Sequence, residues 1–304
     1  MDNNNDLKRF LNKFPLFVII LITLDFLIGG IFKYYYFKQR SGILYRTTYT
    51  IDSTKANLLV FGSSRATHHY VPSIFESKLH TTFYNAGRDG CNLIYYSAVI
   101  SAVLERYTPK HIIIDLTPNE LDFSEEGRLS PLLPYYKNPV VYNYIKYNSK
   151  FENWKLLSKM YPFNSIFTTI IIGNLATNKS QILEDKGYIK LENTMPFHPI
   201  KTFKHDQIID KRVKILNELL AKLNKKHIAV TLVVSPSYFL YRKNDPVIVA
   251  IQKLVAKHDN INFFNYENDP AFAKYQLYSD DDHLNEWGAQ KFSQDLTTKL
   301  INTN

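Results

Sequence analysis

Short apolar runs alternate with longer stretches of helical periodicity over most of this chain. Each run is only a few residues long, is rich in β-branched or aromatic residues, and ends in polar or glycine-containing turns, which is typical of buried strands. The five runs that we predict as strands are 57–61, 82–86, 111–116, 228–234 and 261–264. Continuous apolar strands between helices predict a parallel sheet that is covered on both faces.

Helical spacing occupies the intervals between these strands. The strongest case is 206–226, where Val213, Leu216 and Leu220 fall on one face of a helix. The other predicted helices are 72–79, 93–107, 246–258 and 286–301. The alternation predicts a flavodoxin-like three-layer α/β/α fold with a five-stranded parallel sheet, whose ligands bind beyond the C-terminal ends of the strands.

Residues 124–204 interrupt the alternation. This segment is rich in Tyr, Asn and Lys and has helical stretches near 139–148, 154–160 and 167–175. We predict a helical insertion over the sheet, which either forms a lid or substrate groove or is a layer that only completes the core. The expected organisation is therefore an N-terminal segment, 1–40, followed by one domain over 41–304 that contains this insertion.

The N-terminal segment contains a nineteen-residue apolar run, Phe14 to Phe32, in which only Asp25 is charged. At about 1.5 Å per residue, a helix of this length approaches the thickness of the hydrocarbon core of a bilayer. Lys33 and three consecutive tyrosines follow, and tyrosine favours the membrane interface. Since no small-x-small cleavage site follows, we predict an uncleaved single-pass anchor rather than a signal peptide or a buried helix. Asp25 is costly in a bilayer, so we expect it to be protonated or to contact another membrane helix.

Composition and charge narrow the possible classes of function. The chain has 304 residues and one cysteine, which excludes an intramolecular disulfide. Six Lys or Arg against three Asp in residues 1–40 account for +3 of the net charge of +9, and the remaining +6 is spread without a dense basic run. This favours an anionic envelope or polymer over a nucleic-acid partner. No zinc-finger, Walker or Gly-x-Gly-x-x-Gly spacing is found, so we expect no cofactor.

Polar corners follow the first three predicted strands, and another polar loop follows the fifth. In chain order they are Gly62-Ser63-Ser64, Gly87-Arg88-Asp89-Gly90, Thr117-Pro118-Asn119-Glu120 and Asp280-Asp281-Asp282-His283. The carboxyl ends of parallel strands meet at one edge of a sheet, so we expect these corners to lie together.

Taken together, the corners resemble those of the SGNH (GDSL-like) hydrolase superfamily over about residues 57–300, the insertion excepted. The matches, in chain order, are Gly62-Ser63-Ser64 at the Gly-Asp-Ser block, Gly87 at the second-block glycine, Thr117-Pro118-Asn119-Glu120 at Gly-x-Asn-Asp, and Asp280 to His283 at Asp-x-x-His. Two residues depart from the family pattern, because Ser63 replaces its aspartate and Thr117 replaces its glycine. An anchor followed by a Gly-Ser-Ser corner is more similar to the envelope D-alanyl-transfer and polysaccharide O-acetylation relatives than to secreted lipases.

The resemblance implies a role for each of these residues. Ser64 would be the nucleophile, and a serine hydroxyl needs a base, here His283, to remove its proton. Asp280 would orient that imidazole and stabilise its cation. The backbone N–H groups of Ser64 and Gly87 and the side-chain amide of Asn119 would form the oxyanion hole. The family pattern selects Asp280 from three consecutive aspartates, which the residues alone do not separate.

Several neighbouring residues have two readings each. Arg65 and Arg88 could bind an anionic substrate group or could make structural hydrogen bonds. His68 and His69 could line the pocket or lie exposed on a helix. The aspartate cluster could bind a divalent metal ion, but no second histidine lies at ligand spacing, so we expect no metal. Cys91 is expected to be a small buried residue.

The function that the resemblance implies is that of a membrane-anchored extracytoplasmic serine esterase or O-acyltransferase. Its substrate would be an acyl ester of a cell-envelope glycan. A multi-span membrane acyltransferase is a candidate partner. A non-catalytic envelope scaffold that binds glycan or a membrane partner is the main alternative. A flavodoxin-like nucleotide binder is a third, disfavoured because the chain has no glycine-rich phosphate loop.

Overall fold

The computed structural model of the chain describes residues 3–122, 128–175, 184–203, 205, 208–258 and 260–303. It divides into two compact units, Met1–Tyr45 with Ser130–Ala176, and Arg46–Leu129 with Thr177–Asn304. We call them the anchor unit and the sheet unit. The sequence placed the whole of 124–204 in one insertion, whereas the structure groups 130–175 with the N-terminal helix and 184–203 with the sheet. Residues 124–127, 176–183 and 204 of that insertion lie outside the described residues.

The sheet unit is built on a five-stranded parallel sheet in the order β2-β1-β3-β7-β9. The strands are β1 Leu58–Gly62, β2 Phe83–Asn85, β3 His111–Asp115, β7 Ala229–Val234 and β9 Ile261–Asn265. The first strand lies inside the sheet and the chain winds outward in both directions, which is the flavodoxin-like order. Gly62 is opposite Asp115 in the register, so the corners after β1 and β3 are neighbours. The predicted fold class is confirmed.

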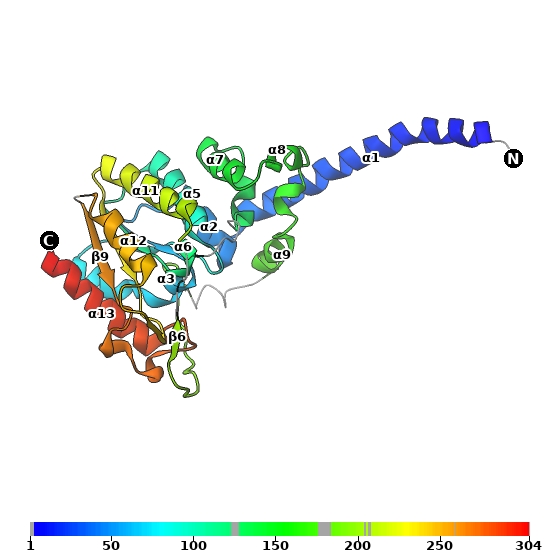
Figure 1. Ribbon diagram of the computed structural model, residues 1–304. Helices are drawn as coiled ribbons and strands as arrows, with labels where there is room; N and C mark the ends of the chain where they lie inside the picture. The colour runs from blue at the N-terminus through cyan, green and yellow to red at the C-terminus, as the bar shows by residue number, and fades with distance from the viewer. Residues whose placement is uncertain are drawn as a thin grey trace. The chain divides into compact units, whose positions relative to one another are not determined.

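Helices cover both faces of this sheet, because its strands are apolar on both sides. They are α3 Ser64–His69, α4 Pro72–Leu79, α5 Leu93–Arg106, α6 Asn119–Asp122, α11 Asp210–Lys225, α12 Pro246–Val255 and α13 Glu286–Thr303. A further helix, α2 Gly42–Asp52, precedes β1 in the chain. The helices α4 and α13 pack together, as do α5 and α11. Figure 1 shows α11 and α13 on different sides of β9.

The end of α3 is fixed to α13, which matters because α3 begins at Ser64. The hydroxyl of Ser293 donates to the carbonyl oxygen of His69 at 3.0 Å and accepts the N–H of Val71 at 2.9 Å. The Tyr70 ring packs edge-on against Phe292, with centroids 5.2 Å apart. These contacts belong to an apolar core that lies between β1, α4 and α13.

Three short strands lie within residues 184–203, a part of the predicted helical insertion in which the sequence indicated no helical stretch. The pair β4 Glu184–Asp185 and β5 Tyr188–Ile189 is antiparallel, and β6 Lys201–Phe203 pairs in parallel with β8 Phe239–Tyr241. Lys186 and Gly187 both have positive φ, +48° and +86°, as the tight turn between β4 and β5 requires. The carbonyl of Lys186 accepts the N–H of Asn85, which covers the end of the edge strand β2.

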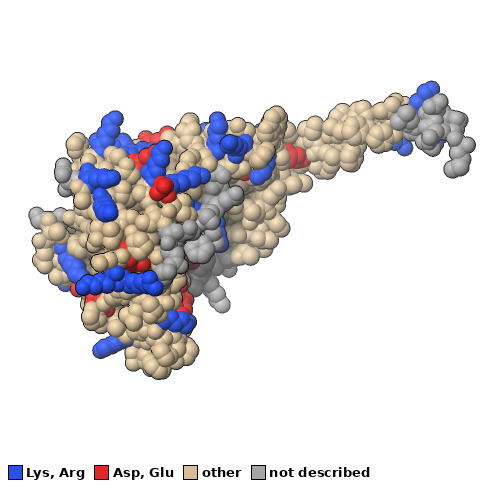
Figure 2. Space-filling view, viewed as in Figure 1, with Lys and Arg blue, Asp and Glu red and all other residues tan. Residues whose placement is uncertain are grey.

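The anchor unit is helical, as the sequence predicts for its part of the insertion. It contains α1 Asn3–Lys38, the 3₁₀ turns Ser130–Tyr135 and Tyr161–Phe163, and the helices α7 Pro139–Asn148, α8 Glu152–Lys155 and α9 Phe167–Leu175. Over Lys8–Lys38, α1 is long and apolar enough to cross a membrane, with a mean hydropathy of 2.4 in its most apolar window. Most of the length of α1 shows neither blue nor red in Figure 2.

Candidate active site

Ser64 lies at a sharp corner between β1 and α3. Gly62 has φ +154°, and a Cβ atom there would lie 2.5 Å from the carbonyl oxygen of Asp115, so the corner requires glycine. Ser63 is the N-cap residue and Ser64 is the first residue of the helix. The first N–H groups of a helix have no acceptor within it, so they are available to an anion. The corner therefore places Ser64 at the start of a helix, where the first N–H groups lack acceptors within the helix.

His283 connects Ser64 to Asp280. Its Nε2 lies 2.6 Å from Oγ of Ser64, and its Nδ1 lies 2.8 Å and 2.9 Å from the two carboxylate oxygens of Asp280. With Nδ1–H donating to the carboxylate, Nε2 is the acceptor for the serine hydroxyl proton. The structure thus brings together the three residues that the sequence nominated, at the distances that proton transfer needs.

The loop that carries His283 is closed on itself. Oδ1 of Asp280 accepts the backbone N–H groups of Asp282 and His283, both at 2.9 Å, and Tyr278 forms an antiparallel bridge with Leu284. Partial burial opposes the charge on Asp280, but the hydrogen bond and charge of His283 and these two N–H groups outweigh it. The pKa of the Asp280 carboxyl is therefore below its ordinary value, and the carboxylate beside His283 is ionised at neutral pH.

The two aspartates that follow Asp280 have other partners. Asp281 binds Nε2 of His198 at 2.7 Å and Nζ of Lys201 at 2.8 Å. Asp282 binds Nη2 of Arg65 at 2.7 Å. The structure therefore separates three carboxylates that the sequence could not separate, because each has different partners.

Arg65 and Arg88 are both buried, which favours the structural one of their two readings. Arg65 is 2% exposed, lies 3.5 Å from the carbonyl oxygen of Ser235, and binds Asp282 in the loop that carries His283. Arg88 is 6% exposed, and its backbone N–H donates to the carbonyl of Gly62 at 3.0 Å. Its guanidinium lies beside the thiol of Cys91, which is buried as predicted, and burial raises the pKa of that thiol to about 11.

His69 is hydrogen-bonded to the same loop. Its ring is fully buried, Nε2 accepts the backbone N–H of Leu284 at 2.9 Å, and Nδ1 lies 3.0 Å from Oγ of Ser235. Burial, with the charges of His283 and Arg65 nearby, holds the pKa of His69 well below its ordinary value, so the ring is neutral and can accept this hydrogen bond. His69 therefore positions the backbone next to His283. The reading of His69 as an exposed helix residue is wrong.

His68 is buried as well and also contacts the His283 ring. Its Nδ1 donates to the carbonyl oxygen of Ile189 at 2.7 Å, and its ring stands edge-on to His283 with centroids 5.5 Å apart. Its Nε2 lies 3.6 Å from Asp89, whose pKa is lowered to about 2 by His68 and Thr67 against the effect of burial. This histidine packs against the His283 ring and links it to β5.

Gly87 differs from its expected role as an oxyanion donor. Its N–H donates to Oδ1 of Asn85 at 2.9 Å, and Nδ2 of Asn85 donates in turn to the carbonyl of Ala66. A Cβ atom at Gly87 would lie 2.5 Å from the backbone nitrogen of Thr67. Glycine is therefore needed here for the close approach of two backbones, and the donors left for an oxyanion are the Ser64 N–H and the Asn119 amide.

The two residues that depart from the SGNH pattern contact each other. Oγ of Ser63 and Oγ1 of Thr117 are 3.1 Å apart. This hydrogen bond joins the corner after β1 to the corner after β3. Asn119 follows Thr117 by two residues, so the bond also holds the Asn119 corner against that of Ser64.

Asn119 is held by a buried histidine that the sequence did not single out. Nε2 of His205 donates to Oδ1 of Asn119 at 2.9 Å, and Nδ1 of the same ring lies 2.8 Å from Oδ2 of Asp245. His205 and Asp245 are each 2% exposed, and the histidine ring stacks on Tyr241 at 5.5 Å between centroids. With its oxygen bound in this way, Asn119 has its NH₂ group left to donate. The sequence gives no local signal for this contact, because 86 residues separate the partners.

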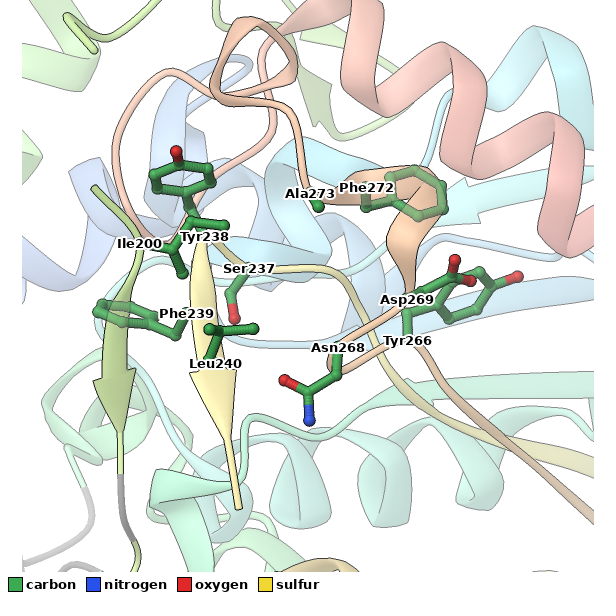
Figure 3. Close-up of a pocket in the computed structure, with 10 residues that line it drawn as sticks. All are labelled: Ile200, Ser237, Tyr238, Phe239, Leu240, Tyr266, Asn268, Asp269, Phe272 and Ala273. Atoms are coloured by element: carbon green, nitrogen blue, oxygen red, sulfur yellow. The ribbon is translucent and has the colours of Figure 1, made fainter. Parts of the chain in front are cut away.

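A small cavity lies among the loops that follow β7 and β9 (Figure 3). It is lined by Ile200, Ser237, Tyr238, Phe239, Leu240, Tyr266, Asn268, Asp269, Phe272 and Ala273. It encloses about 30 Å³, which is room for a water molecule but not for an acyl ester. The cavity is therefore a feature of packing and not a second candidate site.

No family model matches the chain, and no curated protein matches it. Solved structures similar to it include a Streptococcus pneumonia protein named for platelet activating factor, at 12% identity over 94% of this chain and 99% of that one, with a TM-score of 0.46. A psychrotrophic esterase from Pseudoalteromonas sp. is 13% identical over 81% and 98%, with a TM-score of 0.42. A two-domain esterase active on acetylated mannans is 15% identical over 87% and 54%, with a TM-score of 0.43. Such low values say nothing about the activity of this chain, which must be argued from its own residues.

Proposed function

We propose that this chain is a serine esterase or O-acyltransferase of the SGNH type. The observation that carries the proposal is the series of contacts from Ser64 through His283 to Asp280, with 2.6 Å and 2.8 Å between the hydrogen-bonded atoms. A serine hydroxyl, an imidazole and a carboxylate in this order form a nucleophile, its base and the group that orients the base. The resemblance of the four sequence blocks to the SGNH pattern supports the same assignment.

The first half of the proposed reaction makes an acyl-enzyme. Oγ of Ser64 attacks the carbonyl carbon of the acyl ester while its proton passes to Nε2 of His283. Asp280 stabilises the resulting imidazolium. The Ser64 N–H and the NH₂ group of Asn119 stabilise the negative charge on the carbonyl oxygen. The tetrahedral intermediate then expels the alcohol, which takes the proton from His283, and the acyl group remains on Ser64.

The second half of the proposed reaction removes the acyl group and regenerates the Ser64 hydroxyl. A water molecule or a glycan hydroxyl attacks the acyl carbon, and His283 takes its proton. The intermediate collapses, Ser64 leaves, and the proton on His283 returns to Oγ. Water gives an esterase and a sugar hydroxyl gives an O-acyltransferase, so the choice depends on which acceptor occupies the site.

We further propose that α1 anchors the protein in the cell membrane and that the sheet unit acts outside the cytoplasm on esters of envelope glycans. The length and hydropathy of α1 support the anchor. The spread positive charge of the rest of the chain suits an anionic envelope polymer. A multi-span membrane acyltransferase remains the candidate partner for acyl transfer.

Ester turnover by the full-length chain in detergent tests the proposed reaction. We expect hydrolysis of p-nitrophenyl acetate, and we expect Ser64→Ala to reduce it by about 10³-fold or more. Ser63→Ala is the matched control at the neighbouring hydroxyl, and we expect it to cost no more than about tenfold, the loss of one neutral hydrogen bond. Equal turnover in Ser64→Ala and the wild type would favour the non-catalytic scaffold.

A further inference from the structure

A dense set of exposed apolar side chains lies in the anchor unit, apart from α1 itself. Residues 151–175, which we call the collar, contain α8, the turn Tyr161–Phe163 and α9. Seven large apolar side chains of the collar are each 44% to 74% exposed: Phe151, Trp154, Leu157, Phe167, Ile171, Ile172 and Leu175. A water-facing surface seldom gathers this many, so the collar is a candidate interaction surface.

The collar is bound to the apolar run of α1. Asp25 accepts hydrogen bonds from Oγ of Ser158 at 2.5 Å and from the N–H groups of Lys159 and Met160 at 2.7 Å and 3.2 Å. The sequence left Asp25 either protonated or in contact with another membrane helix, and the structure gives it partners within the same chain. Asp25 precedes the end of the run at Phe32 by seven residues, or about 10 Å of helix. The collar thus lies alongside a part of α1 that is apolar enough to enter a bilayer.

The backbone of the collar is hydrogen-bonded where it is bound to α1. Every N–H from Trp154 to Asn164 has an acceptor within the anchor unit, and Pro162 has no N–H. Most of these acceptors are carbonyl oxygens three or four residues earlier, while Asp25 and the Ser158 hydroxyl serve the three N–H groups at the bend. Irregular backbone enters a bilayer only when its polar groups are satisfied inside the protein. The collar meets that condition.

The contact with α1 continues along α9 as an apolar groove. Ile31, Phe32 and Tyr35 line one side, and Ile170, Ile171 and Leu175 line the other, around a volume of about 340 Å³. The rings of Phe32 and Phe167 meet edge-on, with centroids 6.4 Å apart. The apolar surface of α1 is therefore continuous with that of the collar.

The charge of this part of the chain also suits a membrane surface. Residues 130–175 contain five lysines and one acidic residue, Glu152, so their net charge is +4. Glu152 is itself neutralised within the collar, by Nζ of Lys155 at 3.0 Å and by the hydroxyl of Tyr161 at 2.7 Å. Lysines next to a membrane-spanning helix are attracted to anionic lipid headgroups.

We propose that the collar inserts into the lipid bilayer beside α1, with its exposed aromatic and aliphatic side chains at the boundary of headgroups and acyl chains. A single apolar helix would hold the protein by one flexible attachment, whereas helix and collar together form one wider membrane-bound body. Tryptophan at position 154 fits this depth, since it favours the membrane interface. The proposal rests on α1 as a membrane anchor and does not depend on ester chemistry.

Tryptophan fluorescence tests the proposal, because the chain has only two tryptophans, Trp154 and Trp287. Trp154 lies in the collar and Trp287 is 71% exposed on α13, beside polar neighbours. The full chain carrying Trp287→Phe therefore reports on the collar alone, and the chain carrying Trp154→Phe is the matched control. Both are reconstituted into phosphatidylcholine–phosphatidylglycerol vesicles, with or without bromine on the acyl chains.

We expect brominated lipid to remove about half or more of the Trp154 emission and to leave Trp287 unchanged, and acrylamide in the water to do the reverse. If Trp154 is instead open to acrylamide and unaffected by bromine, the collar lies in water and the proposal is overturned. If Trp154 is closed to both, protein covers it, from a second copy or a membrane partner, which also overturns the proposal. Flotation of the vesicles reports separately on α1, and protein that fails to float removes the anchor and the proposal together.

Discussion

Nε2 of His205 lies 2.9 Å from Oδ1 of Asn119, so a buried imidazole holds the one side-chain amide proposed to stabilise the oxyanion. Asp245 holds the other ring nitrogen at 2.8 Å, and its second oxygen accepts the N–H of Val247 at the start of α12. A donor stabilises a transition state best when it is already aimed at the developing charge. His205 and Asp245 are therefore proposed as positioning residues, which act through Asn119 and do not touch the substrate.

Replacement of His205 tests this role. We expect His205→Ala to lower kcat by about tenfold or more, up to the 10²–10³-fold expected when the donor itself is removed in Asn119→Ala. KM should change little, because the amide acts on the transition state and not on the bound ester. His205→Gln keeps an N–H near Oδ1 and should recover part of the loss. Steady-state ester kinetics measure all three variants, and a purely structural His205 would give full kcat in the variants that remain folded.

Asp280 and Asp281 are adjacent but should differ sharply on substitution. Asp280→Asn leaves a side chain of the same shape but removes the charge that orients His283, so we expect turnover to fall by about 10²–10⁴-fold. Asp281→Asn alters only the contacts with His198 and Lys201, and we expect it to stay within about tenfold of the wild type. Ester turnover of the two variants side by side measures the contrast. Equal losses would contradict the assignment of the three aspartates.

Asp282 should matter for stability because its partner, Arg65, is a buried cation. Removing one member of such a pair leaves the other charge without compensation. Asp282 itself is about half exposed, so we expect Asp282→Asn to lower the free energy of unfolding by only about 1–3 kcal/mol. Glu218→Gln, in the exposed pair with Lys214, is the control and should cost less than about 1 kcal/mol. Thermal unfolding in detergent gives both values, and an unchanged midpoint in Asp282→Asn would show that Arg65 does not need its partner.

Glu120 should make the protein less stable as the pH rises. Burial raises the pKa of its carboxyl to about 8, although the Tyr96 hydroxyl donates to it at 2.8 Å. Between the ordinary pKa of 4.5 and about 8, the folded chain keeps a proton that the unfolded chain releases, so stability falls across this window. We expect Glu120→Gln to flatten part of that fall and to stabilise the protein at pH 8 by a few kcal/mol.

Unfolding midpoints measured from pH 5 to pH 9 check this prediction. Glu267, whose pKa burial also raises to about 8, should leave part of the pH dependence in place. Glu218→Gln should follow the wild-type curve, because that side chain is exposed. If Glu120→Gln were less stable than the wild type at pH 8, Glu120 would be ionised in the folded protein.

The sheet and its polar corners could be predicted because both have local signals. The apolar run at 57–61 and the abrupt glycine and serines after it predict a strand and a corner without any knowledge of the fold. The Asp-x-x-His spacing likewise brings Asp280 and His283 together within one loop. The strands β4 and β5 could not be predicted from periodicity, since they have two residues each. Only the Lys186-Gly187 turn marks them in the sequence.

Contacts between distant segments could not be predicted from the sequence for a different reason. The hydrogen bonds from His205 to Asn119 and from Ser158 to Asp25 depend on how the chain folds. No spacing rule in the sequence joins residues that are 86 or 133 positions apart. The burial of individual side chains also could not be predicted from the sequence. The sequence left two readings open for Arg65 and for His69, and the structure shows that both side chains are buried.

Labelling by a fluorophosphonate probe tests the central claim most directly, because the probe forms a covalent bond only with an activated serine. We expect the full-length protein to be labelled at Ser64, with the site identified by mass spectrometry of the labelled peptide. Ser63→Ala should still be labelled, while Ser64→Ala should not, and His283→Ala should be labelled far more slowly. Unchanged labelling of Ser64→Ala, or no labelling of the folded wild-type protein, would contradict Ser64 as the nucleophile.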